Sequence, residues 1–308
     1  MKYRALGNTG LEVSEIGFGT WGIGGVVEGA HSYGPTNDKE SRQALRRAFD
    51  LGITLYDTSP LYGLGHSEEL LGQAFAKDRS KVIMASKVGF HSFTEPQDFS
   101  LHRIRSSLEE TLGRLRTDYL DLYQLHSPPP EVLADGRVLA ALADLKQEGK
   151  IRAYGISIKS PHDGIRAVQR FPSLQMNFSM TDQRARTCGL FDCAIKNNIG
   201  IIARTPFNFG ILTGKFSETK FDPRDHRSAR SPEQLRQWSL AADELTKLNK
   251  GKNRTLAQLA LQFCLAHQAV SAVIPGMLTV AEVEENVQVS KMGQLEESNL
   301  KTIYHLYQ

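Results

Sequence analysis

The chain alternates short apolar runs with longer amphipathic segments over most of its length. The segments between the runs carry apolar residues at i, i+3 and i+4, the spacing of helices, for example at 39–52, 101–117 and 254–268. This alternation of strand-like runs and helical segments predicts parallel strands joined by helices on the outside. The expected strands are 15–20, 54–59, 82–88, 120–126, 151–158, 174–180, 200–205 and 271–276. We therefore favour an α/β fold of the (β/α)8 TIM barrel type over an open doubly wound sheet, which usually has fewer strands.

One domain is expected over residues 1–308, because no low-complexity linker or shift in composition divides the chain. A single barrel commonly takes about 250 residues. The opening stretch "LGNTGL", 6–11, is typical of a hairpin turn. We expect this N-terminal hairpin to close the bottom of the barrel. Ser67 is a candidate N-cap for the helix near 66–76, and Gly52 for the end of the preceding helix.

The charge pattern argues against nucleic-acid binding, since the formal net charge is only +3 and no basic arm is present. Arginines at 224–236 alternate with acidic residues and indicate a solvated loop, or less readily a cluster that faces an anionic substrate. No signal-peptide or membrane-spanning run is found, and the three cysteines form no metal or disulfide motif. We expect a cytoplasmic protein without a metal, a nucleic-acid partner or a membrane partner.

Polar residues stand where the expected strands end, which is where barrel enzymes place their catalytic groups. Asp57, Lys87 and His126 end the second, third and fourth strands, and Tyr62 follows the second by one turn. Others lie at or in the later strands, namely Ser157, Gln175 and Arg204. One histidine or lysine at a strand end is commonly structural, but four such groups converging on one rim indicate a catalytic site.

These four side chains suit the protonation of a carbonyl oxygen. A phenol has a pKa of about 10, and a buried ammonium beside it lowers that pKa. A carboxylate keeps the ammonium charged, and a histidine can orient and polarise the carbonyl. Because no side chain can supply hydride to the carbonyl carbon, the chemistry requires a cofactor.

Several collinear motifs resemble the aldo-keto reductase superfamily over nearly the whole chain. They include "YDTSPLYG", "ASKVG", "LDLYQLHSP", "LKQEGKIRAYGIS" and "GILTGKF". The resemblance implies a barrel that binds an extended nicotinamide cofactor across its C-terminal face. It further implies that Tyr62 is the general acid, Lys87 lowers its pKa, Asp57 pairs with Lys87 and His126 orients the carbonyl.

The stretch "GFGTWG", 17–22, satisfies the G-x-G-x-x-G pattern but is not followed by helical spacing, so we do not interpret it as a dinucleotide fingerprint. On the resemblance, Thr20 and Trp21 line the pocket instead. The resemblance also implies that Trp21, Tyr62, Phe90 and His126 contact the substrate.

Of the positions that contact the cofactor in the family, some are matched in this chain and others are replaced. Ser157 and Gln175 match positions that hold the nicotinamide carboxamide close to Asp57, whereas Ile158 stands where asparagine is common. Arg204 replaces a tyrosine that often stacks on the nicotinamide ring, and a guanidinium can stack there too. Because the oxidised ring is itself cationic, that stack is less favourable on it, and we therefore favour the reductive direction. The pyrophosphate loop would contribute, partly through backbone N–H groups, Phe207, Gly210, Leu212 and Lys215.

The last loop departs from the family pattern. After Gly276 and Met277, many relatives carry Arg or Lys at the position of Leu278 and Gln or Arg at the position of Glu282. A carboxylate there would repel a 2′-phosphate and accept hydrogen bonds from a free ribose hydroxyl, so NADH rivals the usual NADPH. Alternatively, Glu282 faces solvent and NADPH binds through other residues. The adenine-side positions are matched by Glu285 and Asn286.

Three functions remain open. The first is reduction of an aldehyde or ketone to an alcohol with NADPH or NADH. The second is oxidation of a sugar by NAD⁺ on the same four residues. The third is a non-catalytic cofactor-binding subunit, similar to potassium-channel β subunits. The last helical segment is followed by only a few residues, so we expect an open pocket for a small carbonyl or sugar substrate.

Overall fold

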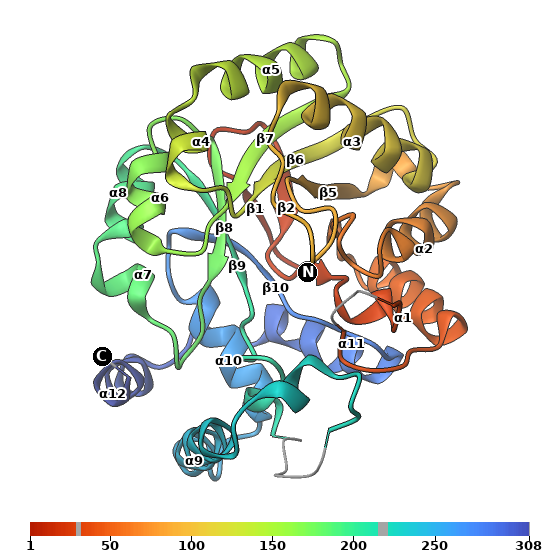
Figure 1. Ribbon diagram of the computed structural model, residues 1–308. Coiled ribbons are helices and arrows are strands. Elements are labelled where there is room, and N and C mark those ends of the chain that lie inside the picture. Colours follow the sequence, from red (N-terminus) through yellow and green to blue (C-terminus); the bar gives the residue numbers. More distant parts are fainter. Residues whose placement is uncertain (29–31, 215–220, 308) are drawn as a thin grey trace.

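The computed structural model describes residues 1–28, 32–214 and 221–307. Its main sheet has eight parallel strands, each hydrogen-bonded to the next in sequence order (Figure 1). Isolated bridges join Ile16 to Val273 and Gly19 to Gly276, so the first strand meets the last and the barrel closes. The strands are β3 (Phe18–Gly19), β4 (Leu55–Asp57), β5 (Ile83–Val88), β6 (Leu120–His126), β7 (Ile151–Ser157), β8 (Ser173–Asn177), β9 (Gly200–Arg204) and β10 (Val270–Ile274). The predicted (β/α)8 barrel is confirmed, with strands somewhat shorter than expected.

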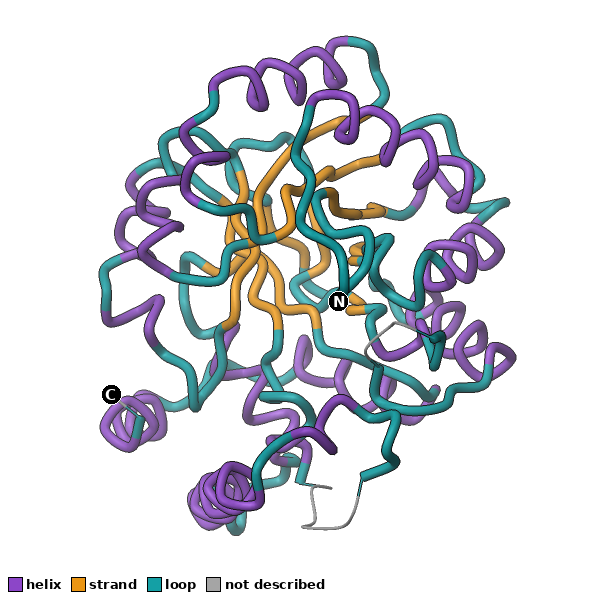
Figure 2. Tube along the Cα trace, in the orientation of Figure 1, coloured by secondary structure: helices purple, strands orange, loops and turns teal. Residues whose placement is uncertain are grey.

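Helices surround the strands on the outside, as Figure 2 shows for the strands in orange and the helices in purple. They are α1 (Asp38–Asp50), α2 (His66–Phe75), α3 (Leu101–Leu115), α4 (Pro130–Ala134), α5 (Gly136–Gln147), α6 (Pro161–Ala167), α7 (Arg184–Thr187), α8 (Leu190–Lys196), α9 (Pro232–Leu248), α10 (Leu256–Leu265), α11 (Val280–Val287) and α12 (Glu297–Leu306). Gly52 follows α1 with φ +90°, as expected of a residue that ends a helix. None of the helices in the described part of the chain is long and apolar enough to span a bilayer.

Barrel closure explains the glycines of "GFGTWG". The Gly19 N–H donates to the Pro275 carbonyl at 2.9 Å, and a Cβ on Gly19 would lie 2.8 Å from the Ile274 carbonyl oxygen. The segment then enters a short 3₁₀ turn, Gly22–Gly24, rather than an α-helix. These glycines therefore serve the contact between β3 and β10, in agreement with our rejection of the dinucleotide fingerprint.

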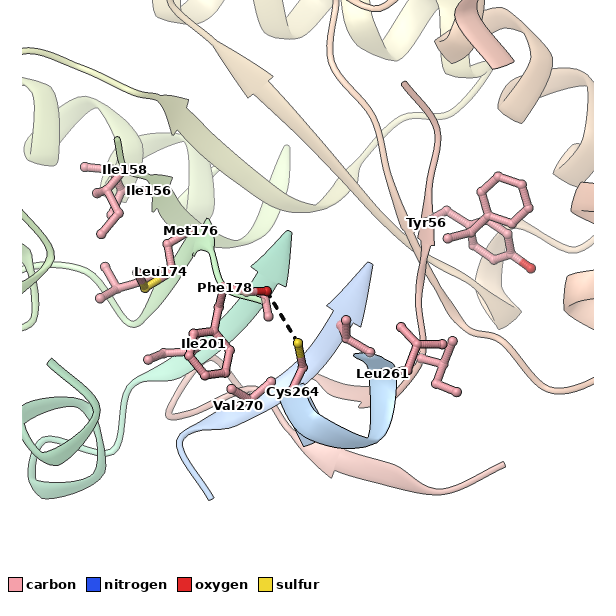
Figure 3. Packing of buried hydrophobic residues seen from close by; sticks show 14 of the residues in the cluster. Tyr56, Ile156, Ile158, Leu174, Met176, Phe178, Ile201, Leu261, Cys264 and Val270 are labelled. Carbon is pink, nitrogen blue, oxygen red and sulfur yellow. Dashed lines mark hydrogen bonds between the residues drawn. The ribbon is translucent and has the colours of Figure 1, made fainter. Parts of the chain in front are cut away.

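Two apolar layers hold the fold together. Outward-facing strand residues pack under the helices; around β8 and α10, for example, the Cys264 thiol donates to the Phe178 carbonyl at 3.4 Å (Figure 3). Inward-facing residues fill the barrel below the rim: Leu55, Ile83, Ala85, Leu122, Ala153, Ile202, Ala272 and Ile274. Alternation of side chains along each strand separates the two layers.

The N-terminal hairpin seals the lower layer. Strands β1 (Tyr3–Ala5) and β2 (Glu12–Ser14) pair antiparallel, and the Leu6 N–H donates to the Leu11 carbonyl at 2.9 Å across the turn. Leu6, Leu11 and Val13 are buried in the same cluster as the inward-facing strand residues. The hairpin is therefore the bottom of the barrel, as predicted.

Two local predictions need correction. The N-cap of α2 is Gly65, because the Ser67 hydroxyl lies inside the helix and donates to Thr20 Oγ1 at 2.7 Å. The arginine-rich segment is exposed at Arg224, Arg230 and Arg236, as predicted, but it is not all loop, since α9 begins at Pro232. Within it, Asp225 is only 3% exposed and pairs with Arg227.

Candidate active site

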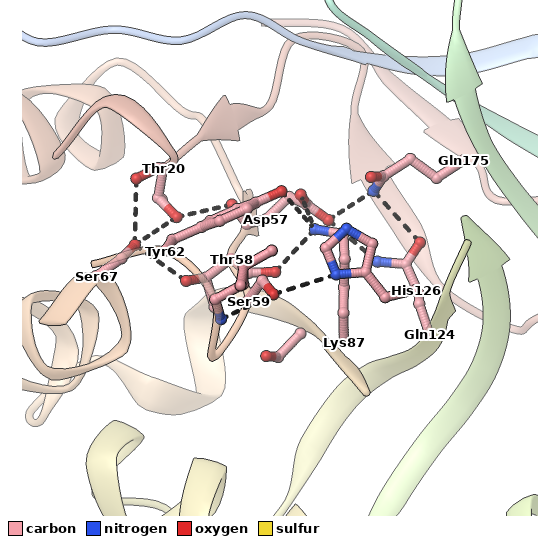
Figure 4. A network of polar contacts seen from close by, with 12 residues as sticks. Thr20, Asp57, Thr58, Ser59, Tyr62, Ser67, Lys87, Gln124, His126 and Gln175 are labelled. Carbon is pink, nitrogen blue, oxygen red and sulfur yellow. Dashed lines mark hydrogen bonds and ion pairs between the residues drawn. The ribbon is translucent and has the colours of Figure 1, made fainter. Parts of the chain in front are cut away.

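Strand register brings the predicted polar residues to one layer at the C-terminal rim. Lys87 lies opposite Gln124 in the β5–β6 ladder, and His126 lies opposite Ser157, which in turn lies opposite Gln175. Since side chains alternate along parallel strands, residues at matching register point into the barrel together. Asp57, Tyr62, Lys87 and His126 converge there (Figure 4).

Lys87 is the centre of the cluster and is fully buried. Its Nζ donates to Asp57 Oδ1 at 2.5 Å, to the Thr58 carbonyl at 2.8 Å and to the Tyr62 hydroxyl at 3.2 Å. Burial alone would lower the pKa of the ammonium, but the neighbouring Asp57 and Tyr62 outweigh burial and raise it. Lys87 is therefore a cation at neutral pH, and it contacts the phenol oxygen.

The Asp57 carboxylate is held by donors from three strands. Besides Lys87, its Oδ2 accepts from Gln175 Nε2 at 2.7 Å and from Gln124 Nε2 at 3.1 Å. Gln124 did not emerge from the sequence analysis. The signal was present, because Gln124 is a polar residue two positions before His126 in an apolar strand and so faces the same way.

Tyr62 is fixed by the turn that follows β4. Its N–H donates to the Ser59 carbonyl at 3.0 Å, and its carbonyl accepts from the Ser67 N–H at 3.2 Å. Below it, the buried hydroxyls of Thr58, Ser67 and Thr20 form a hydrogen-bonded chain that ends on the Asp57 carbonyl. The chain ties the turn to the strand ends and so fixes the spacing between Tyr62 and Asp57.

His126 is neutral in this environment. Burial lowers its pKa well below the usual range, and the cations of Lys87, Arg204 and Lys159 lower it further. Its Nδ1 lies 3.4 Å from the Ser59 hydroxyl, which already accepts the Leu61 N–H at 3.2 Å. We infer that the serine hydrogen points to Nδ1, which leaves Nε2–H as the donor available to a substrate.

Two neighbouring cavities form a trench across this rim. One of about 300 Å³ lies over the cluster and is lined in part by Thr20, Trp21, Asp57, Tyr62, Phe90, His126, Gln175, Arg204 and Gly276. The other, of about 520 Å³, is lined in part by Phe207, Gly210, Gly276, Leu278, Glu282, Glu285 and Asn286. They share Gly22, Tyr33, Thr205, Phe209 and Gly276.

The remaining predicted cofactor residues lie elsewhere. Leu212 and Met277 are fully buried and line neither cavity, Ser157 is 1% exposed and also lines neither, and Lys215 falls outside the described residues. The N–H groups of Gly210 and Leu212 both donate to the Phe207 carbonyl at 3.0 Å. Those two N–H groups are therefore used within the turn, so the structure does not support the predicted backbone contacts from them to a pyrophosphate.

Unpartnered polar atoms near the cluster fit a nicotinamide carboxamide. Ser157 Oγ, Gln175 Oε1 and Arg204 Nε are buried without a hydrogen-bond partner among the described residues, and they lie on three adjacent strands. Buried polar atoms normally find partners. A carboxamide offers both the N–H donors that Gln175 Oε1 needs and the carbonyl that a serine hydroxyl can bind.

Glu282 is oriented by the start of α11. Its Oε2 accepts from the Leu278 N–H at 2.8 Å, while its own N–H donates to the Thr279 hydroxyl at 3.2 Å. This reciprocal capping holds the carboxylate at the wall of the larger cavity. Among the described residues that line that cavity, the one cation is Arg227, which is paired with Asp225.

Comparison with known proteins gives a consistent picture. The model of the aldo/keto reductase family matches residues 15–308. The chain is 36% identical over 93% of its length, and 87% of the relative's, to an L-galactose dehydrogenase of Arabidopsis thaliana. It is 30% identical, over 93% of both chains, to an NADH-specific methylglyoxal reductase of Escherichia coli (strain K12). The solved aldo-keto reductase AKR11C1 from Bacillus halodurans (holo form) superposes with a TM-score of 0.81 at 30% identity, covering 100% of this chain and 97% of that one.

Proposed function

The chain belongs to the aldo/keto reductase family, an oxidoreductase family that uses nicotinamide cofactors, and from that premise we propose that it reduces an aldehyde or ketone to an alcohol. The observation that carries the proposal is the buried Lys87 ammonium, which contacts the Asp57 carboxylate and the Tyr62 hydroxyl at once. That contact favours the phenolate that remains after proton transfer. Tyr62 is then the acid that protonates the carbonyl oxygen.

The other residues prepare the carbonyl for that proton. Neutral His126 donates from Nε2 to the carbonyl oxygen and so orients it toward Tyr62. Because its low pKa keeps the imidazole unprotonated at neutral pH, the proton comes from Tyr62 and not from His126. Asp57 keeps Lys87 charged and in place, while Gln124 and Gln175 hold Asp57. Trp21 and Phe90 supply apolar walls that restrict water at the reacting oxygen.

The trench supports an extended nicotinamide cofactor. When bound, the nicotinamide supplies the hydride. Ser157 and Gln175 would hold the carboxamide through their unpartnered oxygens, and Arg204 would lie against the ring. Phe207, Glu285 and Asn286 would line the adenosine end.

Glu282 favours NADH as the cofactor. A carboxylate held at the cavity wall, with Glu285 beside it, repels a 2′-phosphate and suits a free ribose hydroxyl. A second candidate, oxidation of a sugar with NAD⁺, is favoured by the same residue and by the name of the Arabidopsis relative. Arg204 supports the reductive direction, because a guanidinium stacks less favourably on the cationic oxidised ring than on the neutral reduced one.

The test is a comparison of cofactor binding and turnover. Trp21 fluorescence is titrated with NADH and NADPH at one ionic strength, and cofactor absorbance then follows a panel of small aldehydes, ketones and, with NAD⁺, aldoses. Carbonyl reduction with NADH at the higher kcat/KM supports the proposal. Aldose oxidation that is faster than any reduction would favour the second candidate, and tight binding without any turnover would favour a non-catalytic cofactor-binding protein.

A further inference from the structure

Two cations face the cavity over the catalytic cluster without a carboxylate partner. Lys159 and Arg204 both line it, and neither belongs to any ion pair among the described residues. Asp57 is the one carboxylate that lines this cavity in the described part of the chain, and it is already bound by Lys87, Gln124 and Gln175. No carboxylate among the described lining residues therefore pairs with either cation, and the exposed Lys159 ammonium is accessible to a ligand.

Lys159 and the imidazole of His126 both lie next to the Phe90 ring. Its ammonium lies 5.6 Å from the centroid of the Phe90 ring, and that ring lies edge-on to His126 with 5.0 Å between the ring centroids. The charge is felt at the reacting position, since Lys159 is among the cations that lower the pKa of His126. A short molecule with its carbonyl on His126 can therefore reach the ammonium with its far end.

The position of Lys159 separates it from the adenosine end of the proposed cofactor. Lys159 does not line the larger cavity, where the adenosine end of a cofactor would lie. Arg204, by contrast, would lie against the nicotinamide ring. An anion that Lys159 binds would therefore belong to the substrate.

We propose that the substrate is a short carbonyl compound with an anionic group, phosphate or carboxylate, at the end remote from the carbonyl, and that Lys159 Nζ binds this group. The inference rests on the proposed carbonyl reduction. The small cavity, about 300 Å³, limits the chain length. Its walls include Trp21, Phe90 and Phe93, so an anion that lies against these rings gains most from pairing with a cation. Charge-assisted pairing of this kind contributes about a tenfold preference or more.

The experiment compares matched substrates on matched variants. Glyceraldehyde 3-phosphate is compared with glyceraldehyde, and succinic semialdehyde with butanal, so that the two pairs distinguish phosphate from carboxylate. The variants are Lys159→Met, which removes the charge, and Lys159→Arg, which retains it. Lys196→Met, on an exposed lysine of α8 outside both cavities, is the control.

We expect the wild type and Lys196→Met to prefer at least one anionic substrate by about tenfold in kcat/KM, with the preference shrinking as salt is added. Lys159→Met should lose most of that preference, mainly through KM, and Lys159→Arg should keep most of it. Equal kcat/KM within both pairs in the wild type, or equal losses on charged and neutral substrates in Lys159→Met, would overturn the inference.

A binding measurement separates this inference from the proposed function. If no variant turns over any substrate, the proposed reduction fails, and calorimetric titration of the wild type and Lys159→Met with glycerol 3-phosphate and with glycerol then decides on the anion site. About tenfold weaker binding of glycerol 3-phosphate to Lys159→Met supports the site. Equal binding by the two proteins, or absence of binding, overturns it.

Discussion

At the scale of single residues, Asp57 is the branching point of the site. Its carboxylate accepts one hydrogen bond from the lysine that contacts the proposed acid and another from Gln175, whose free oxygen faces the proposed carboxamide position. In the proposed mechanism, cofactor binding and proton transfer therefore share one carboxylate. The roles of the neighbouring residues can be separated by substitutions that change one group at a time.

Tyr62→Phe removes the proposed proton donor and leaves the ring in place. We expect kcat to fall by about 10²-fold or more, because general acid catalysis contributes that much. Cofactor affinity should change little, since the hydroxyl contacts Lys87 rather than the proposed cofactor residues. Steady-state kinetics and fluorescence titration test this, and an unchanged kcat would remove Tyr62 as the acid.

Substitutions at Glu282 test the cofactor preference. Glu282→Gln retains an oxygen that can accept the Leu278 N–H but removes the charge, so the NADPH-to-NADH ratio of Kd values should fall. Glu282→Arg should lower that ratio further, by about tenfold, through attraction of the 2′-phosphate. If neither variant alters the ratio, Glu282 does not face the ribose.

The pH profile tests the state of His126. Because its pKa lies well below 6.5, kcat for reduction should stay level as the pH falls through 6.5, with no loss from protonation of the imidazole. His126→Asn should lower kcat and keep the same level profile. An acid limb centred near pH 6.5 in the wild type but missing from His126→Asn would contradict a neutral histidine.

The sequence alone predicted the site residues whose direction is decided by their position in a strand. Asp57, Lys87 and His126 end strands, so their inward position follows from the barrel. Gln124 was overlooked although its place two residues before His126 gives it the same direction, whereas Lys159 lies on a loop, where the sequence does not show what it faces. Leu212 was placed in the cofactor site by resemblance, whereas packing buries it.

At the scale of elements, the end of α10 is fastened to α12 through a partly buried histidine. His267 Nδ1–H donates to the Phe263 carbonyl at 2.9 Å, and Nε2 accepts from the Tyr304 hydroxyl at 2.9 Å. The second bond requires the neutral imidazole, because a protonated Nε2 could no longer accept from the Tyr304 hydroxyl. Burial accordingly lowers the pKa of His267 to about 4.

This histidine makes the fold sensitive to acid. In the unfolded chain the imidazole binds a proton below its ordinary pKa of 6.5, whereas in the folded protein it stays neutral down to about pH 4. The free energy of unfolding therefore falls as the pH falls through this window. His267→Gln should be less stable at neutral pH. It should lose about 2 kcal/mol less than the wild type between neutral pH and about pH 5. Urea unfolding at the two pH values measures the difference, and parallel losses in both proteins would contradict it.

Helix α9 shows where element prediction fails. Residues 224–236 were interpreted as a solvated loop, but α9 starts at Pro232 behind a Ser231 cap. Leu235, Trp238, Ala242 and Leu245 recur at helical spacing, but the charged residues at the start of the helix outweighed that spacing in the prediction. The helices next to the barrel bury wider faces and were recognised from their spacing.

At the scale of the whole molecule, the division into domains remains a prediction. If residues 1–308 form one domain, chemical denaturation should give one transition, seen alike by Trp fluorescence and far-UV circular dichroism. Saturating cofactor should raise the midpoint of that single transition, since it binds the folded state alone. Two separated transitions would indicate two units that unfold independently.

The hairpin-sealed lower layer also bears on how such a protein changes over evolutionary time. The apolar cluster of the hairpin and inner strands holds the barrel from beneath. Lys159, Glu282 and Phe90 lie instead on loops or at a helix start above the strands. A rim residue can therefore be replaced at little cost to the scaffold. Selection can explore new substrates and cofactors one loop at a time, while the lower half keeps every intermediate folded.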